Sequence, residues 1–157
     1  MKAMKASEMA AVMEGRYFGA ENLIVSGECR FDSREVESGD FFLALKGETN
    51  DGHLFVEDAH ANGAVLAITT KEVSGPHIVV KDVLEAAAKL AHANRMALPN
   101  LAVVGITGSQ GKTTTKDILR TVLSSAGTTV APIGSYNNEI DRKSTRLNSS
   151  HANISYA

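Results

Sequence analysis

Several residue patterns are scarce or missing in this sequence of 157 residues, and each absence excludes a class of protein. Cys29 is the only cysteine, so no disulfide can form within the chain. Sixteen Lys and Arg stand against eighteen Asp and Glu, so there is no basic excess to bind nucleic-acid phosphates. No apolar run approaches the roughly 18 residues needed to cross a bilayer. We therefore expect no disulfide scaffold, no nucleic-acid partner and no membrane partner.

The composition that remains is that of an ordinary globular protein. Hydrophobic residues make up 43% and charged residues 22% of the chain, which predicts a packed core in one ordinary domain or two small ones. The first residues, MKAMKASEMAAVMEGRYFG, lack the apolar stretch of an export signal. Together these features predict a cytoplasmic protein.

The first 98 residues predict an alternation of strands and helices. A helix is expected over 7–13, capped by Ser7, with Met9 and Met13 in the core and Gly15 at its end. Strands are expected over 23–26, 41–45, 64–69 and 78–80.

Two further helices are expected in this region, over 54–62 and from 83 to about 96. In the first, the side chains expected to face inward are Phe55, Val56 and Ala59, and Gly63 is the expected stop. Asp82 and Glu85 predict a capping box at the start of the second.

A different unit begins after Pro99-Asn100, which we interpret as the boundary between a domain of residues 1–98 and the start of another over 99–140. Residues 101–107 read as a continuous apolar strand of the kind that a parallel sheet buries on both faces. A Gly-rich loop, a helix over 112–125 and a strand over 128–131 are expected to follow. The helix side expected to be buried consists of Ile118, Leu119, Val122 and Leu123.

The last residues, 141–157, do not continue this pattern. They contain no glycine and carry a charge of +2, whereas residues 1–140 carry −4. The segment DRKSTRLNSSHANISYA resembles translated adaptor sequence at the end of a fragmentary reading frame, and we interpret it as non-native.

The most specific motif is GITGSQGKTT over residues 105–114. Gly108 and Gly111 allow backbone amides to point at phosphate oxygens, and the helix that begins near Lys112 adds unpaired amides and a positive dipole end. Lys112 would place its charge on the β and γ phosphates, and the Thr113 hydroxyl would join the shell of a Mg²⁺ ion. The pattern predicts a site for ATP and Mg²⁺.

The motif departs from the strict G-x-x-x-x-G-K-[ST] pattern, because Ile106 stands where the first glycine belongs. The structural alternative is a Gly-rich turn between a strand and a helix, with Lys112 exposed to solvent.

T-G-S-Q-G-K-T-T-T over 107–115 resembles the signature of the Mur ligases, ATP-dependent enzymes that build the peptide of peptidoglycan. Two other groups of segments agree with this resemblance. Residues 31–34, 38–47, 51–53 and 63–64 are similar to the UDP-sugar-binding domain of two members, and residues 134–140 resemble a segment of the member that adds D-alanyl-D-alanine.

The resemblance implies an α/β fold in which a small UDP-sugar-binding domain precedes the first strand, P-loop, helix and strand of the central ATPase domain. It implies ligation of D-alanyl-D-alanine to UDP-N-acetylmuramoyl-tripeptide through an acyl phosphate, with ADP released. The sister ligase that adds the third residue is the alternative. Family members place a metal-binding acid, a modified lysine and a C-terminal domain further along the chain, so this piece alone is expected to be inactive.

The resemblance also assigns roles to individual residues. Lys112 is the catalytic lysine and Thr113 the metal ligand. The residues that it implies for ATP binding are Gly108, Ser109, Gln110, Gly111, Lys112, Thr113, Thr114, Asn137 and Asn138. The residues that it implies for substrate binding are Asp32, Ser33, Arg34, Lys46 and His53.

Plain chemistry leaves alternatives open for the substrate residues. Arg34 could bridge Asp32 in a turn that serves only the fold, Lys46 could be a solvated turn lysine, and His53 could cap the helix at Leu54. For the whole chain, two other classes remain open: a stand-alone P-loop module with an unrelated N-terminal domain, and an interaction protein that binds no nucleotide.

Overall fold

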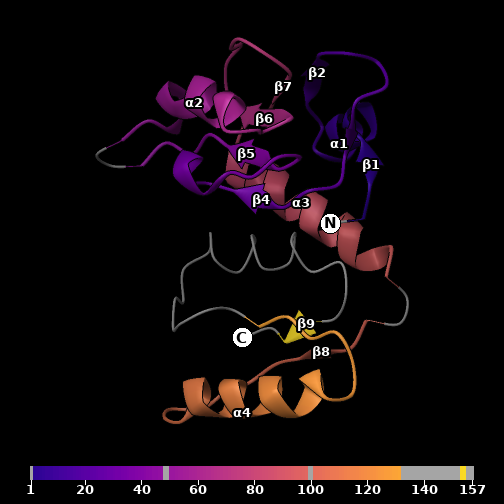
Figure 1. Ribbon diagram of the computed structural model, residues 1–157, viewed down its shortest axis with the longest axis vertical. Coiled ribbons are helices and arrows are strands. Elements are labelled where there is room, and N and C mark those ends of the chain that lie inside the picture. Colours follow the sequence, from indigo (N-terminus) through magenta and orange to yellow (C-terminus); the bar gives the residue numbers. More distant parts are fainter. Residues whose placement is uncertain (1, 48–49, 99–100, 132–152, 155–157) are drawn as a thin grey trace.

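The computed structural model describes residues 2–47, 50–98, 101–131 and 153–154. These residues form two α/β parts: in Figure 1 the first runs from indigo through magenta to the salmon helix α3, and the second includes the orange helix α4 and the yellow strand β9. We call residues 2–98 the N-terminal unit, and residues 101–131 with 153–154 the second unit.

The N-terminal unit is built on a five-stranded sheet with the order β2-β7-β6-β5-β4. Four strands run parallel: β4 (Cys29–Arg30), β5 (Phe41–Leu43), β6 (Leu66–Thr69) and β7 (His77–Val79). The edge strand β2 (Arg16–Phe18) pairs antiparallel with β7, and a separate antiparallel pair joins β1 (Met4–Lys5) to β3 (Ile24–Val25). Every residue of β5 and β6 is buried, as expected for parallel strands covered on both faces.

Helices cover both faces of this sheet, as Figure 1 shows. On one face, α1 (Ala6–Val12) and α3 (Val83–Met96) share a core with Phe41, Leu66 and Ile68. On the other, α2 (Val56–Ala61) packs on Phe42 and Ala67. Two short 3-10 turns, η1 (Ser33–Glu35) and η2 (Gly52–Phe55), lead into this second face. The alternation along β5 and β6 therefore divides the core into two layers.

Several predictions for the helices of the N-terminal unit are confirmed. The Asp82 half of the predicted capping box is present: the Asp82 carboxylate caps α3 and accepts a hydrogen bond from the Glu85 N–H at 2.7 Å. Met9 and Met13 lie in the core. The strands expected at 23–26, 41–45, 64–69 and 78–80 are present as β3, β5, β6 and β7, each shorter or shifted by a residue.

Other predictions for these helices are wrong. Ser7 lies inside α1, and the N-cap is Lys5, whose N–H donates to Glu8 Oε2 at 3.3 Å. The side chain of Phe55 is 39% exposed because it ends a 3-10 turn rather than belonging to the inward face of α2.

Gly15 follows α1 as expected, but the left-handed conformation belongs to Glu14, at φ 55°. The Gly15 N–H donates to the Ala10 carbonyl at 2.8 Å and so closes the helix. A Cβ on Gly15 would lie 2.6 Å from Ile78 Cγ2 and 2.8 Å from the Val79 oxygen. Gly15 is therefore needed for the close approach of the chain to β7.

Three strands of the N-terminal unit were not predicted: β1, β2 and β4, each of two or three residues. Cys29 in β4 is 2% exposed and belongs to the core shared with α1 and α3. Burial raises the pKa of its thiol well above the ordinary value.

The second unit contains β8 (Val103–Val104), paired in parallel with the backbone of β9 (Asn153–Ile154), and α4 (Lys112–Ser124). The expected strand over 101–107 is much shorter, and Val103 is 38% exposed rather than buried. Leu119 and Leu123 pack on Ile106 and Ala131. Ile118 and Val122, expected on the same buried side of the helix, are 58% and 59% exposed.

Residues 128–131 form an isolated bridge at Val130 in place of the expected strand. None of the helices described in this chain is long and apolar enough to cross a lipid bilayer.

Candidate functional site

The Gly-rich loop, residues 105–111, joins β8 to α4 in the order that the sequence predicted. Gly108 and Gly111 have φ angles of +150° and +76°, conformations that L side chains rarely adopt. Gly111 is the N-cap of α4, and no atom lies within 4 Å of where its Cβ would be. The glycine is therefore required by conformation at this position and not by lack of space.

Lys112, the first residue of α4, is half-buried and turns back over the loop. Its Nζ donates a hydrogen bond to the Gly108 carbonyl oxygen. Between described residues, no hydrogen bond is donated by the backbone N–H groups of Ser109 and Gln110. An ammonium group thus lies beside unpaired amides at the positive end of a helix, an arrangement suited to a phosphate.

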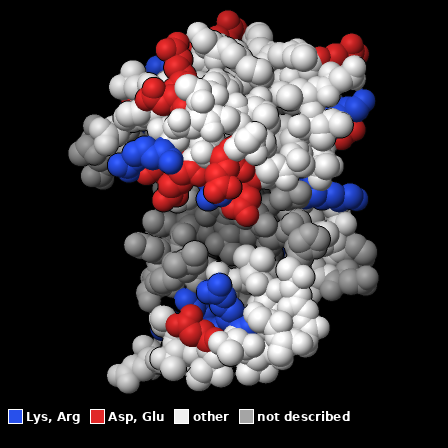
Figure 2. Space-filling model, viewed as in Figure 1, with Lys and Arg blue, Asp and Glu red and all other residues white. Residues whose placement is uncertain are grey.

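Basic side chains gather on the second unit. Figure 2 shows a group of blue side chains there with a small acidic group beside it. Within α4, Lys116 is buried and its Nζ lies 3.0 Å from Asp117 Oδ1. Thr113 and Thr114 are exposed near the start of the helix. Asn137 and Asn138, also predicted to bind ATP, lie outside the described residues, as does most of the segment 141–157.

The residues predicted to bind the substrate follow the parallel strands of the N-terminal unit. Asp32 comes after β4 and Lys46 after β5. Thr70, which the sequence did not single out, directly follows β6. The carboxyl ends of parallel strands meet at one edge of a sheet, where α/β proteins commonly bind ligands. The topology therefore supports a site at this edge.

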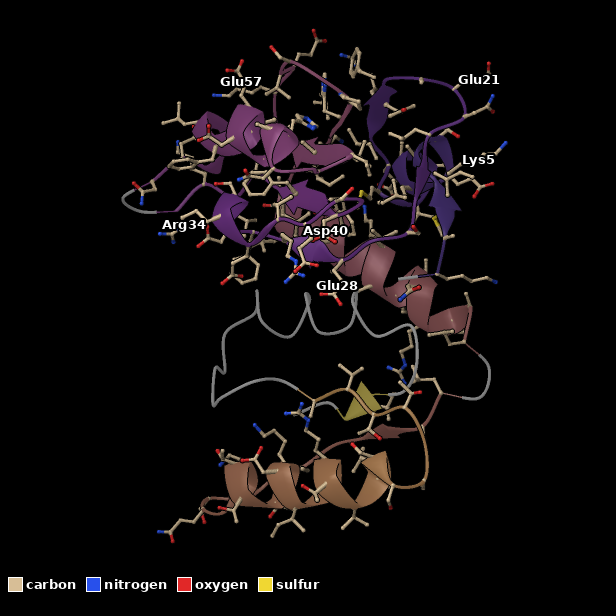
Figure 3. The ribbon with its side chains drawn as sticks, viewed as in Figure 1. Lys5, Glu21, Glu28, Arg34, Asp40 and Glu57 are labelled. Atoms are coloured by element: carbon tan, nitrogen blue, oxygen red, sulfur yellow. The ribbon has the colours of Figure 1, made fainter. Side chains whose placement is uncertain are left out.

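Asp32 and Arg34 form a closed pair in the η1 turn. Arg34 donates from Nε to Asp32 Oδ1 at 2.9 Å and from Nη2 to Oδ2 at 2.6 Å. The hydrogen bonds from the Arg34 side chain and backbone lower the pKa of Asp32 to about 2. Arg34 is exposed, and Figure 3 shows it at the outer edge of the unit. The bridging arrangement considered from the sequence is the one observed.

Ser33, between these two residues, is buried and held by its main chain. Its carbonyl oxygen accepts a hydrogen bond from Asn62 Nδ2 at 2.9 Å, which ties the turn to the end of α2.

Beyond the turn, buried Asp40 accepts hydrogen bonds from the Glu28 N–H at 2.7 Å and from Arg30 Nε at 2.9 Å. Figure 3 shows Asp40 above Glu28 at the lower side of the unit. The sequence did not predict these contacts of Asn62 and Asp40, because their hydrogen-bond partners are distant in the sequence.

Lys46 and His53 have opposite environments. Lys46 is exposed and lies opposite Asp51 in an isolated antiparallel bridge. The His53 side chain is buried, and Nδ1 lies 2.5 Å from Asp51 Oδ1. Its Nε2 accepts a hydrogen bond from the Thr70 N–H at 3.0 Å. His53 does not cap a helix at Leu54, because the capping carboxylate of η2 belongs to Asp51.

Comparison with known proteins agrees with this geometry. A model of the Mur ligase family catalytic domain matches residues 28–104, and a model of the Mur ligase middle domain matches residues 106–157. The chain belongs to the Mur ligase family. The resemblance seen in the Gly-rich loop is therefore confirmed, together with the α/β fold that it implied.

Individual Mur ligases are similar over most of this chain. The UDP-N-acetylmuramoyl-tripeptide--D-alanyl-D-alanine ligase of Mycobacterium tuberculosis is 39% identical over 146 residues, covering 78% of this chain and 29% of the relative. The Escherichia coli ligase of the same name is 34% identical over 143 residues, covering 90% and 31%. The chain thus spans about three tenths of the length of the curated relatives it matches.

Solved structures of Mur ligases show the same fold. A crystal structure of MurF from Acinetobacter baumannii has a TM-score of 0.84 at 31% identity and covers 99% of this chain and 36% of the neighbour. The MurF ligase of Thermotoga maritima in complex with ADP has a TM-score of 0.65 at 33% identity, covering 82% and 31%.

Proposed function

We propose that this chain is part of an ATP-dependent ligase that joins D-alanyl-D-alanine to UDP-N-acetylmuramoyl-tripeptide during peptidoglycan synthesis. One observation carries the proposal: the Lys112 ammonium is bound to the Gly108 carbonyl, next to the Ser109 and Gln110 amides that donate to no described residue, in a chain 39% identical over 146 residues to a ligase of that name. The Thermotoga maritima neighbour was solved with ADP, which supports a nucleotide at this loop.

The residues of the loop fit a triphosphate. The proposed ATP contacts in the described chain are Gly108, Ser109, Gln110, Gly111, Lys112, Thr113 and Thr114, and Asn137 and Asn138 extend the set beyond it. Lys112 would leave the Gly108 carbonyl to neutralise the β and γ phosphates.

Mg²⁺ would be held in part by the Thr113 hydroxyl and would neutralise charge on the transferred phosphoryl group. The described residues contain no cluster of three acidic, His or Cys side chains that could hold a metal ion by themselves.

In the N-terminal unit we propose that the carboxyl edge of the sheet binds the UDP-sugar. Asp32, Ser33 and Arg34 would face the uridine, and Lys46 and His53 would lie toward the diphosphate. Lys46 is exposed there and free to meet an anion, whereas the Asp32–Arg34 pair would open or bind as a unit.

The proposed chemistry begins with transfer of the γ-phosphoryl group of ATP to the terminal carboxylate of the tripeptide. The amine of D-alanyl-D-alanine then attacks this acyl phosphate, and phosphate leaves. Such a transfer depends on positioning and charge neutralisation, which is the role of Lys112. We expect no ligation by this chain alone, because it spans about three tenths of its relatives.

Binding measurements separate the candidate functions. Isothermal titration calorimetry of the chain should show binding of Mg-ATP and, separately, of UDP-N-acetylmuramoyl-tripeptide. Binding of Mg-ATP without any response to the UDP-sugar would support a stand-alone nucleotide-binding module. No response to either ligand would support an interaction protein.

A second candidate is the ligase that adds the third residue of the peptide. It is favoured by 38% identity over 128 residues to the UDP-N-acetylmuramoyl-L-alanyl-D-glutamate--2,6-diaminopimelate ligase of Caldanaerobacter subterraneus. Tighter binding of the UDP-N-acetylmuramoyl-dipeptide than of the tripeptide would support this sister enzyme.

A further inference from the structure

Two short arms of the chain, 45–47 and 50–52, lie side by side beyond β5. The Gly47 N–H donates to the Asn50 oxygen at 2.8 Å, and the Gly52 N–H donates to the Leu45 oxygen at 2.8 Å. A Cβ on Gly52 would lie 2.6 Å from the Leu45 oxygen, so the arms are packed as closely as glycine allows. Lys46 and Asp51 face each other across this pair.

The His53 ring connects these arms to the end of β6. One ring nitrogen, Nδ1, lies 2.5 Å from Asp51 Oδ1 on the second arm. The other, Nε2, accepts from the Thr70 N–H at 3.0 Å and lies 3.1 Å from Thr70 Oγ1. His53 is therefore the link between two segments that both adjoin the proposed diphosphate site.

The hydrogen bonds also determine what the ring can do. Nε2 accepts a main-chain hydrogen bond and so carries no proton, which places the ring proton on Nδ1, where it is donated to Asp51. Both ring nitrogens are then engaged, and the side chain is buried. Neither nitrogen of the His53 ring is left to bind a ligand.

We propose that His53 is a positioning residue that acts through Lys46, in place of the direct substrate contact expected from the sequence. It holds Asp51, and with it the arm opposite Lys46, against the end of β6, so that the Lys46 ammonium is kept where the nucleotide diphosphate lies. This inference rests on the proposed UDP-sugar site.

The Asp51 carboxylate adds a further connection between the second arm and the segment after β6. Hydrogen bonds from the His53 backbone and side chain lower the pKa of Asp51 to about 2. Lys71 Nζ lies 3.7 Å from Asp51 Oδ2 and adds a second connection to the segment that follows β6. Both carboxylate oxygens of Asp51 therefore already have a partner, and they do not compete for the Lys46 ammonium.

The test measures UDP affinity by calorimetry in the whole chain, with thermal unfolding of each variant recorded in parallel. We expect His53→Ala to weaken UDP binding about tenfold, which corresponds to the loss of one or two hydrogen bonds. His53→Gln keeps an acceptor for Thr70 and His53→Asn keeps a donor for Asp51, so each should restore part of the affinity. His92→Ala removes an exposed imidazole from α3 and should leave UDP binding unchanged.

A double-mutant cycle separates positioning from contact. If His53 acts through Lys46, then His53→Ala should weaken UDP binding no further in a Lys46→Met background. A full additional tenfold loss in that background would indicate direct contact and overturn the inference.

Unchanged UDP affinity in a folded His53→Ala variant would also overturn it, by reducing His53 to a structural role. If instead the unmodified chain fails to bind UDP at all while it binds Mg-ATP, the proposed UDP-sugar site itself is wrong.

Discussion

The two units differ in how much of their apolar surface is covered by the described chain. In the N-terminal unit, two layers of side chains pack on the faces of a five-stranded sheet, and Phe41, Leu66 and Leu90 are fully buried. Among the described side chains of residues 101–131, Ile106 and Ala131 are the buried apolar ones, and α4 leaves Ile118 and Val122 exposed. Most of the apolar burial described in this chain therefore lies in the N-terminal unit, while the most specific motif lies in the second.

Because of this difference, the residues that form the larger core are not the residues proposed to bind the nucleotide. The proposed phosphate recognition by the Gly-rich loop needs backbone conformation and one ammonium group, neither of which requires a large core. The proposed substrate edge of the N-terminal unit, by contrast, is assembled from segments that only the complete sheet brings together.

The largest effect should come from matched leucine substitutions in the two units. Leu90→Ala on α3 removes a fully buried side chain and should lower the free energy of unfolding by about 3 to 5 kcal/mol. Leu119→Ala on α4 removes a partly buried one and should lower it by less than about 1 kcal/mol. Urea denaturation measures both, and equal losses would show that the two cores are equally important.

Next in size is a pair of glycine substitutions. Gly15→Ala would place a methyl group 2.6 Å from Ile78 Cγ2 and 2.8 Å from a backbone oxygen, and we expect a loss of about 1 to 3 kcal/mol in the same assay. Gly127→Ala has open space around its Cβ and should change stability by less than about 0.5 kcal/mol. Similar effects at the two positions would contradict the close packing of Gly15 on β7.

A third substitution tests whether the two binding functions are independent. Lys112→Ala removes the ammonium beside the Gly-rich loop and should weaken Mg-ATP binding at least about tenfold, or about 1.4 kcal/mol. UDP binding in the N-terminal unit should be unchanged, as should thermal unfolding. Calorimetric titration with each nucleotide is the measurement. A parallel loss of UDP affinity would mean that the two sites are coupled.

The smallest effect concerns Asp51, whose folded pKa is about 2, below its ordinary value of 3.8. A carboxylate with a lowered pKa stabilises the fold fully above about pH 4 and progressively loses this contribution as the pH falls toward 2. The melting temperature of Asp51→Asn should therefore lie slightly below that of the unmodified chain at pH 7, and the two should converge near pH 2. A difference that is constant over this range would show that the charge of Asp51 contributes nothing.

Local signals in the sequence predicted those parts of the structure that depend on contacts between residues close together in the chain. The Asp82 cap and the long run of apolar positions predicted α3, and the glycine and lysine spacing predicted the loop before α4. Both depend on contacts within a few residues, which a single sequence displays directly.

Contacts between distant segments were not predictable in the same way. β1, β2 and β4 are too short to show a period of two, and their pairing partners determine them. The link from His53 to Thr70 spans 17 residues, so the sequence suggested His53 as a ligand contact without revealing that its ring was already engaged. The exposure of Ile118 and Val122 likewise depends on what packs against α4 and not on the helix itself.

The burial of Cys29 supplies a natural reporter for one unit only. A thiol-specific dye can react with it only when β4 separates from the sheet, so the labelling rate in native buffer records how often the N-terminal unit opens. The second unit is silent in this experiment, because the chain has no other cysteine. Whether a nucleotide slows the labelling of Cys29 then shows whether it binds to the N-terminal unit, and no engineered probe is needed.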